Sequence, residues 1–150
     1  MRALLVRPSK LAEMELDSDL RRIAEAAGRH AADGEEVSGI VPTEPASGIR
    51  LYVCAYGDGE SKAWLVLDAT GVPVRDRSLV HDAVSIAALC EVAEDAAGVE
   101  PEAPRVARPA LLDELGAEGG PAVAAAVKGA ADSVAELARD VERGYKLPLS

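Results

Sequence analysis

Two apolar runs, RLYVCAY (residues 50–56) and KAWLVLD (62–68), flank the glycine-bearing loop GDGES (57–61) and decide the fold. Glycine readily adopts the positive φ that a hairpin loop needs, so this stretch predicts two antiparallel strands. The side chains on the two faces of the first strand are largely apolar: Leu51, Val53 and Ala55 on one face, Tyr52, Cys54 and Tyr56 on the other. A strand with two apolar faces is covered on both sides, so we expect it in the middle of its sheet.

Working outward from this hairpin, we expect an α+β fold with a small, mostly antiparallel sheet. The predicted strands lie near residues 2–6, 11–16, 37–41, 50–56 and 63–68. Pro42 and Pro45 favour a loop between the third and fourth strands, because proline cannot donate to a sheet ladder. Two helices, over about 18–32 and 78–97, are predicted to pack on the sheet. The second is apolar around most of its girth, which is typical of a central helix.

The last third of the chain predicts a helical arm. We divide the chain into an α+β domain (1–98), a connector with three prolines (99–109) and the arm (110–150). Proline-rich connectors are stiff and extended. Within the arm, helices are expected over about 110–116 and 121–144, the second opening on Pro121, a residue suited to the first turn of a helix.

A seam of small and branched apolar residues runs along the second helix of the arm. Its members recur in steps of four and three: Val123, Val127, Ala130, Val134, Leu137 and Val141. This spacing has a period of about 3.5 residues, which is typical of helices that pack along their length. The small side chains, with Gly129 near the middle, suit close approach of another backbone. The arm can fold back on its own domain or clasp a second copy, and both arrangements stay open.

Composition and charge exclude several functions. The 150-residue chain has a net charge of −10 and a pI of about 4.6, which argues against binding nucleic acid or an anionic membrane. Two cysteines are too few for a disulfide framework or a zinc site made of four thiolates. The apolar run in the N-terminal MRALLVRPSK is too short for a signal peptide or a membrane helix, so we expect a cytoplasmic protein. We also expect neither a cofactor nor a metal.

Acidic residues on every second position form a comb before the first helix: Glu13, Glu15, Asp17 and Asp19. Such a comb could hold a cation, but a calcium loop needs an oxygen ligand and then a glycine where this chain has Arg21 and Arg22. We favour a structural interpretation, in which the acids form the solvated face of a strand and discourage edge pairing. Whether the comb binds a cation is left open.

Nucleophile and base candidates are few. His30 ends the first predicted helix, and His81 precedes Asp82 and Ser85 in the second. Adjacent helical positions diverge by about 100°, so His81 and Asp82 cannot readily orient each other as in a hydrolytic triad. The two cysteines, Cys54 and Cys90, fall on apolar stretches and are expected to be small core residues.

Tyr52, Tyr56 and Trp64 bring most of the large rings of a ring-poor chain onto one hairpin. If Tyr52 and Tyr56 lie on the same face, they and a cross-strand neighbour could floor a pocket for an apolar or cationic ligand. The competing interpretation is that they cover the core where helices do not reach.

No family is identified from the sequence. The stretch LVLDATGVPV (65–74), followed by an alanine-rich helix, resembles the roadblock family of dimerising scaffold domains. The opening, through about residue 32, is similar to small phage and plasmid proteins without an assigned role. Each resemblance covers less than a third of the chain and transfers no functional residue.

We therefore expect a small acidic cytoplasmic protein that acts without catalysis, through contacts with another protein or with itself. The leading hypothesis is a homodimer that uses the seam. The first alternative is a module that binds or senses a small molecule at Tyr52, Tyr56 and Trp64. The second alternative is an enzyme with an unrecognised carboxylate or histidine site.

Overall fold

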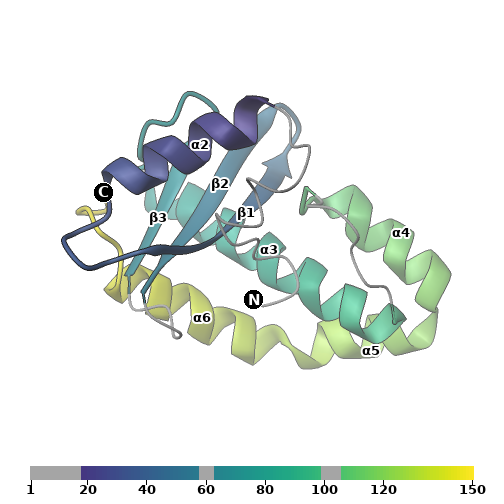
Figure 1. Ribbon diagram of the computed structural model, residues 1–150. Coiled ribbons are helices and arrows are strands. Elements are labelled where there is room, and N and C mark those ends of the chain that lie inside the picture. Colours follow the sequence, from purple (N-terminus) through teal and green to yellow (C-terminus); the bar gives the residue numbers. More distant parts are fainter. Residues whose placement is uncertain (1–17, 58–62, 99–105) are drawn as a thin grey trace.

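The computed structural model describes residues 18–57, 63–98 and 106–150, so the predicted strands near 2–6 and 11–16 lie outside the described residues. Its elements follow in the order α2 (Ser18–Arg29), β1 (Val37–Ala46), β2 (Ile49–Tyr56), β3 (Ala63–Asp68), α3 (Arg77–Ala97), α4 (Pro109–Gly119), α5 (Pro121–Gly129) and α6 (Ala131–Arg143). The sheet is antiparallel in the order β1-β2-β3, with α2 on one face and α3 on the other (Figure 1). The predicted α+β class is confirmed.

The two faces of the sheet build two separate apolar clusters. The face toward α3 carries Val41, Leu51, Val53, Ala55, Trp64 and Val66. The face toward α2 carries Ile40, Tyr52, Cys54, Tyr56, Leu65 and Leu67. Successive strand residues point to opposite faces, so each strand supplies both clusters in turn. The prediction that β2 is central and covered on both sides is confirmed within the described sheet.

The first strand runs further than predicted. We expected a strand near 37–41 and a proline-bearing loop, but β1 continues through Pro42 and Pro45 to Ala46 before a tight turn at Gly48. That expectation was wrong because β1 lies at the edge of the described sheet, where a proline whose nitrogen faces outward breaks no ladder bond. The outward carbonyl of Pro42 instead accepts a hydrogen bond from the N–H of Ala107.

Helix α3 is the centre of the molecule. Asp76 caps its N-terminus by accepting a hydrogen bond from the N–H of Leu79, and Gly98 ends it at φ 71° in the left-handed region. Buried residues occur around most of its girth: Val80, Ala83, Val84, Ile86, Ala87, Ala88, Cys90 and Ala93. The sheet, α4, α5 and α6 all pack against α3, which therefore confirms the expected central helix.

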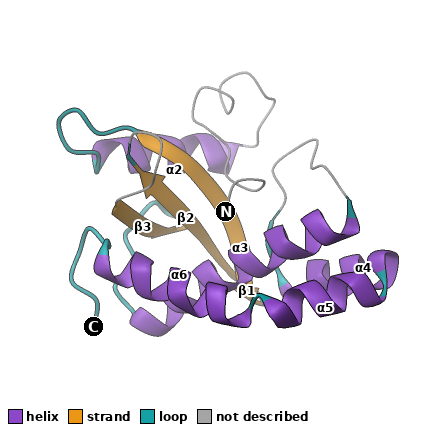
Figure 2. Cartoon of the chain, turned by 90° about the horizontal axis from the view of Figure 1, so that it is seen from below, coloured by secondary structure: helices purple, strands orange, loops and turns teal. Residues whose placement is uncertain are grey.

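The long helix predicted over 121–144 is two helices. The chain breaks at Ala130, between α5 and α6, directly after Gly129. Glycine is a poor helix former, and a local break lets both halves follow α3. An added Cβ at Gly129 would meet nothing within 4 Å, so no described backbone uses the close approach that we expected there. The helices α5 and α6 follow one another along α3, α4 packs beside α5 and α3, and all three lie on the opposite side of the sheet from α2 (Figure 2).

Candidate functional site

The three rings of the hairpin do not meet. Tyr52 and Tyr56 face α2, with 2% and 0% of their surface exposed, whereas Trp64 faces α3 with 7% exposed. Trp64 lies opposite Ala55 in the register, and Ala55 points away from both tyrosines. The hydroxyl of Tyr56 donates to the carbonyl of Ala27 in α2 at 2.8 Å. These side chains therefore fill two cores rather than lining one shared pocket wall.

The seam of the arm contacts its own chain. Val123 and Val141 are buried in the cluster that contains the sheet and α3, and Val127 and Leu137 pack against it while partly exposed. Val134 is also buried, and Ala130 is half-buried at the break between α5 and α6. In this structure the seam packs α5 and α6 along α3.

The last seven residues form a tail (144–150) that lies along the outer edge of β3. The N–H of Trp64 donates to the carbonyl of Gly144 at 2.9 Å, and the N–H of Lys146 donates to the carbonyl of Trp64 at 3.0 Å. Trp64 and Tyr145 thereby form a parallel bridge. At the end of the tail, the N–H of Ser150 donates to the carbonyl of Arg75 at 2.8 Å.

The side chain of Tyr145 forms hydrogen bonds at the part of the β3 edge that the backbone of the tail does not pair with. Its hydroxyl accepts a hydrogen bond from the N–H of Val66 at 3.0 Å and donates to the carbonyl of Val74 at 2.6 Å. Further along, the N–H of Val74 donates to the carbonyl of Val66, and Asp68 pairs with Val72 and Gly71. All six outward backbone groups of Trp64, Val66 and Asp68 thus have partners, so this edge cannot pair with another strand while the tail stays in place.

Lys146 is the one cationic side chain of the tail, and it contacts both a carboxylate and an aromatic ring. It forms an ion pair with Glu35, and its Nζ lies 4.3 Å from the centroid of the Tyr56 ring. Both charged side chains are largely shielded, with 16% of Lys146 and 22% of Glu35 exposed. The Lys146 hydrogen bond and a hydrogen bond from the N–H of Ala32 lower the pKa of Glu35. This contact ties the tail to the segment between α2 and β1.

His81 is paired with a residue that sequence spacing did not suggest. Its Nε2 lies 2.9 Å from a carboxylate oxygen of Glu142 in α6, and the other oxygen of Glu142 accepts from Nε of Arg77 at 2.7 Å. One carboxylate therefore joins the first turns of α3 to the last turn of α6. Asp82 is exposed and Ser85 is half-buried, and within the described residues neither forms a hydrogen bond or ion pair with His81.

Both thiols are buried and poorly suited to nucleophilic chemistry. Burial raises the pKa of Cys54 to about 12 and the pKa of Cys90 to about 11. A thiol that stays protonated at neutral pH is a weak nucleophile. Within the described ranges, no three His, Cys, Asp or Glu side chains gather closely enough to hold a metal ion.

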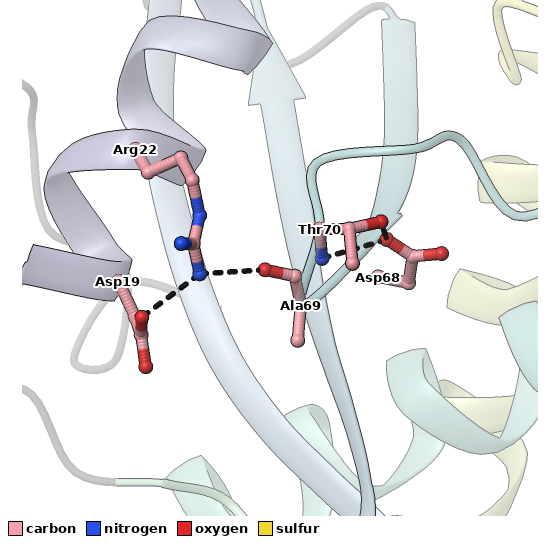
Figure 3. A network of polar contacts seen from close by, with 5 residues as sticks. All are labelled: Asp19, Arg22, Asp68, Ala69 and Thr70. Atoms are coloured by element: carbon pink, nitrogen blue, oxygen red, sulfur yellow. Dashed lines mark hydrogen bonds and ion pairs between the residues drawn. The ribbon is translucent and has the colours of Figure 1, made fainter.

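A polar network joins α2 to the loop after β3. Arg22 reaches from α2 to the carbonyl of Ala69 at 2.9 Å and also pairs with Asp19 (Figure 3). In the loop itself, Asp68 accepts hydrogen bonds from the hydroxyl and the N–H of Thr70. Asp19, the last acid of the comb, therefore belongs to the first turn of a helix, whereas Glu13, Glu15 and Asp17 lie outside the described residues.

The residues of the tail contact are the ones that sequence reasoning missed. Tyr145, Lys146 and Glu35 carry no motif, and Glu35 is 111 positions from Lys146. The available signal was the pattern after the last helix, where Tyr145, Leu147 and Leu149 alternate with other residues as in a strand.

Comparison with known proteins adds no relative: no family model, curated protein or solved structure matches the chain. Among the described helices, none is both long and apolar enough to cross a membrane.

Proposed function

We propose that this protein acts without catalysis, through protein contacts, as a homodimer in which two copies exchange their helical arms. In the dimer, the seam of one copy packs on α3 of the other with the same contacts that it makes within one chain. Domain exchange of this kind keeps every native contact and changes only which chain supplies it.

The packing of the seam on α3 is the observation that carries the proposal. Within the described residues, the exposed large apolar side chains are Ile49 and Val72, and neither belongs to the arm. The exposed positions of α5 and α6 are alanines, charged residues and Pro121, Gly129 and Ser133, with no large apolar side chain among them. A second copy could therefore bury substantial apolar area against this arm only by taking the seam itself, since burial of apolar surface is the main driving force for stable association.

The charged contacts at the arm support the same arrangement. Glu142 and Lys146 belong to the arm, whereas Arg77, His81 and Glu35 belong to the α+β part of the chain. Such contacts select a specific docking position, because a displaced arm leaves charges unpaired. They also give an experiment that distinguishes exchange from folding back.

Sedimentation equilibrium on the full chain is the first measurement, and we expect a dimer mass that depends on concentration. The second measurement uses chains with natural and heavy nitrogen, unfolded together and refolded together. A carbodiimide then couples Lys146 to Glu35 across their ion pair, and mass spectrometry reads the isotopes of the two peptides. Exchange predicts coupled peptides that combine one natural and one heavy partner.

A monomer mass with only same-isotope coupled peptides would reject the proposal. Lys128 gives an internal control, because it is exposed in α5 and pairs with no carboxylate at the arm interface in the described residues. It should give few coupled products in either arrangement.

A further inference from the structure

The tail occupies a groove that recognises it by three kinds of contact. We define this tail groove by the residues that surround Tyr145 and Lys146: Glu35, Tyr56, Trp64, Val66 and Val74. The first contact is the parallel backbone pairing of the tail with Trp64. Backbone pairing along a sheet edge gives affinity for an extended peptide, and side-chain pockets along the edge give specificity.

The second contact is a socket for the hydroxyl of tyrosine. The N–H of Val66 and the carbonyl of Val74 lie on either side of the Tyr145 hydroxyl, at 3.0 Å and 2.6 Å. One group donates and the other accepts, which matches the phenol hydroxyl, able to do both. Phenylalanine could fill the space but would leave both backbone groups without this partner.

The third contact is a site for a cation. Glu35 supplies a carboxylate, and the face of the Tyr56 ring lies 4.3 Å from Nζ of Lys146. A carboxylate and an aromatic face together favour a positive charge that is partly removed from water. The groove therefore requires a tyrosine followed directly by a lysine, presented on an extended backbone.

None of these contacts needs the tail to be part of the same chain. The tail begins at Gly144, directly after the end of α6, and its partners lie in β2, β3 and the loops beside them. Within one chain the groove is filled because the local concentration of the tail is high. When the tail leaves, the outward N–H and carbonyl of Trp64 lose their partners, and an unpaired edge of this kind accepts another strand.

We propose that the tail groove is a peptide-binding site whose occupant between chains is the tail of a second copy. This identification of the occupant rests on the proposed homodimer, whereas the recognition of a Tyr-Lys segment rests on the groove alone. The proposal thus assigns to residues 144–150 the role of the segment that each copy inserts into the β3 edge of the other.

The test uses the full chain with its own tail weakened by Tyr145→Ala and Lys146→Ala. A fluorescent peptide with the sequence RGYKLPLS (residues 143–150) is titrated against it, and anisotropy reports binding. We expect saturable binding, weaker on the unmodified chain because its own tail competes. A Lys146→Glu peptide should bind about tenfold or more weakly, the effect expected when one charge-assisted contact is lost.

A charge swap provides the matched control. Glu35→Lys in the weakened chain should reject the natural peptide and recover binding of the Lys146→Glu peptide. A simply damaged fold would lose both. If the weakened chain does not fold, as judged by circular dichroism, heavy-nitrogen peptide is titrated with the unmodified chain and its amide signals are followed by NMR.

Absence of saturable binding to a folded, weakened chain would overturn the inference, and so would equal binding of the two peptides. The outcomes are separable from those for the homodimer. Peptide binding with a monomeric full chain keeps the groove and rejects its proposed occupant. A dimer with mixed-isotope coupling but no peptide binding keeps arm exchange and rejects the groove as an independent site.

Discussion

The hydroxyl of Tyr145 lies 3.0 Å from the backbone nitrogen of Val66, 79 positions earlier in the chain, and completes the hydrogen bonding of the outer edge of β3. A side chain here takes the place that a backbone carbonyl of a further strand would occupy. The C-terminal tail is consequently held against the β3 edge of the sheet by hydrogen bonds rather than being only an extension of α6.

Replacing Tyr145 should show how much its hydroxyl contributes to the stability of the β3 edge. Tyr145→Phe leaves the N–H of Val66 and the carbonyl of Val74 without their hydroxyl partner. We expect a loss of about 1–3 kcal/mol in the free energy of unfolding, because both groups are left without compensation. Urea unfolding measures this loss. Tyr56→Phe, which removes one hydrogen bond to Ala27, is the comparison and should cost less.

Two glycines in α4 should respond in opposite directions to alanine. A Cβ on Gly119 would overlap Cγ2 of buried Val123 and lie 3.3 Å from Cβ of Ala97, so Gly119→Ala should destabilise by about 1–3 kcal/mol. A Cβ on Gly116 meets nothing within 4 Å, and Gly116→Ala should be neutral or stabilise by about 0.5–1 kcal/mol. Thermal unfolding of both variants checks the pair. Equal effects would mean that α4 does not approach α3 this closely.

The seam should contribute to stability in proportion to its burial. Val141 is fully buried against α3, and Val141→Ala should cost about 2 kcal/mol through lost transfer energy and the cavity that remains. Val72 is 55% exposed, so the same substitution there should change stability by less than about 0.5 kcal/mol. Denaturant unfolding at constant protein concentration compares the two. Similar losses at both positions would contradict the packing of α6 on α3.

The ion pair between Glu35 and Lys146 predicts acid sensitivity. The folded pKa of Glu35 lies below its ordinary value of 4.5, chiefly through Lys146, so the folded state binds fewer protons than the unfolded state between those values. The contribution of Glu35 is therefore complete above the ordinary pKa and is lost as pH falls through the folded pKa. We expect unfolding free energy to fall less steeply below about pH 5 in Glu35→Gln than in the unmodified chain.

Lys146→Met is the control for that prediction. It keeps the carboxylate but removes the cation that lowers the pKa of Glu35. The pH dependence should then flatten, but less than in Glu35→Gln, because the N–H of Ala32 still lowers the pKa of Glu35. A slope unchanged in both variants would show that this ion pair does not stabilise the folded chain.

The cysteines should be unreactive until the chain unfolds. Burial raises the pKa of both thiols, to about 12 for Cys54 and about 11 for Cys90, so little thiolate forms at pH 8. A chromogenic disulfide reagent should modify both thiols rapidly in denaturant. In the native protein it should modify neither thiol rapidly. Rapid modification of a native thiol would contradict its placement in the core.

The rings of the hairpin show which features of the sheet a local sequence pattern can predict. Alternation along β2 predicted which residues share a face, but whether Trp64 joins Tyr52 and Tyr56 depends on the register between β2 and β3. A slip of one residue moves every side chain to the opposite face. The register places Trp64 opposite Ala55, and the ring is thereby assigned to the α3 side.

The sequence by itself determined the α+β class, the central strand, the central helix and the seam of the arm, because these depend on periods of apolar residues. Only the tertiary structure decided that β1 runs through its prolines, that the arm breaks at Ala130, and that the tail joins β3. The course of β1 and the place of the tail depend on neighbours far away in the chain, whereas the break follows Gly129 and lets both halves of the arm pack on α3. No local pattern encodes that Lys146 will meet Glu35, since packing of the whole molecule brings them together.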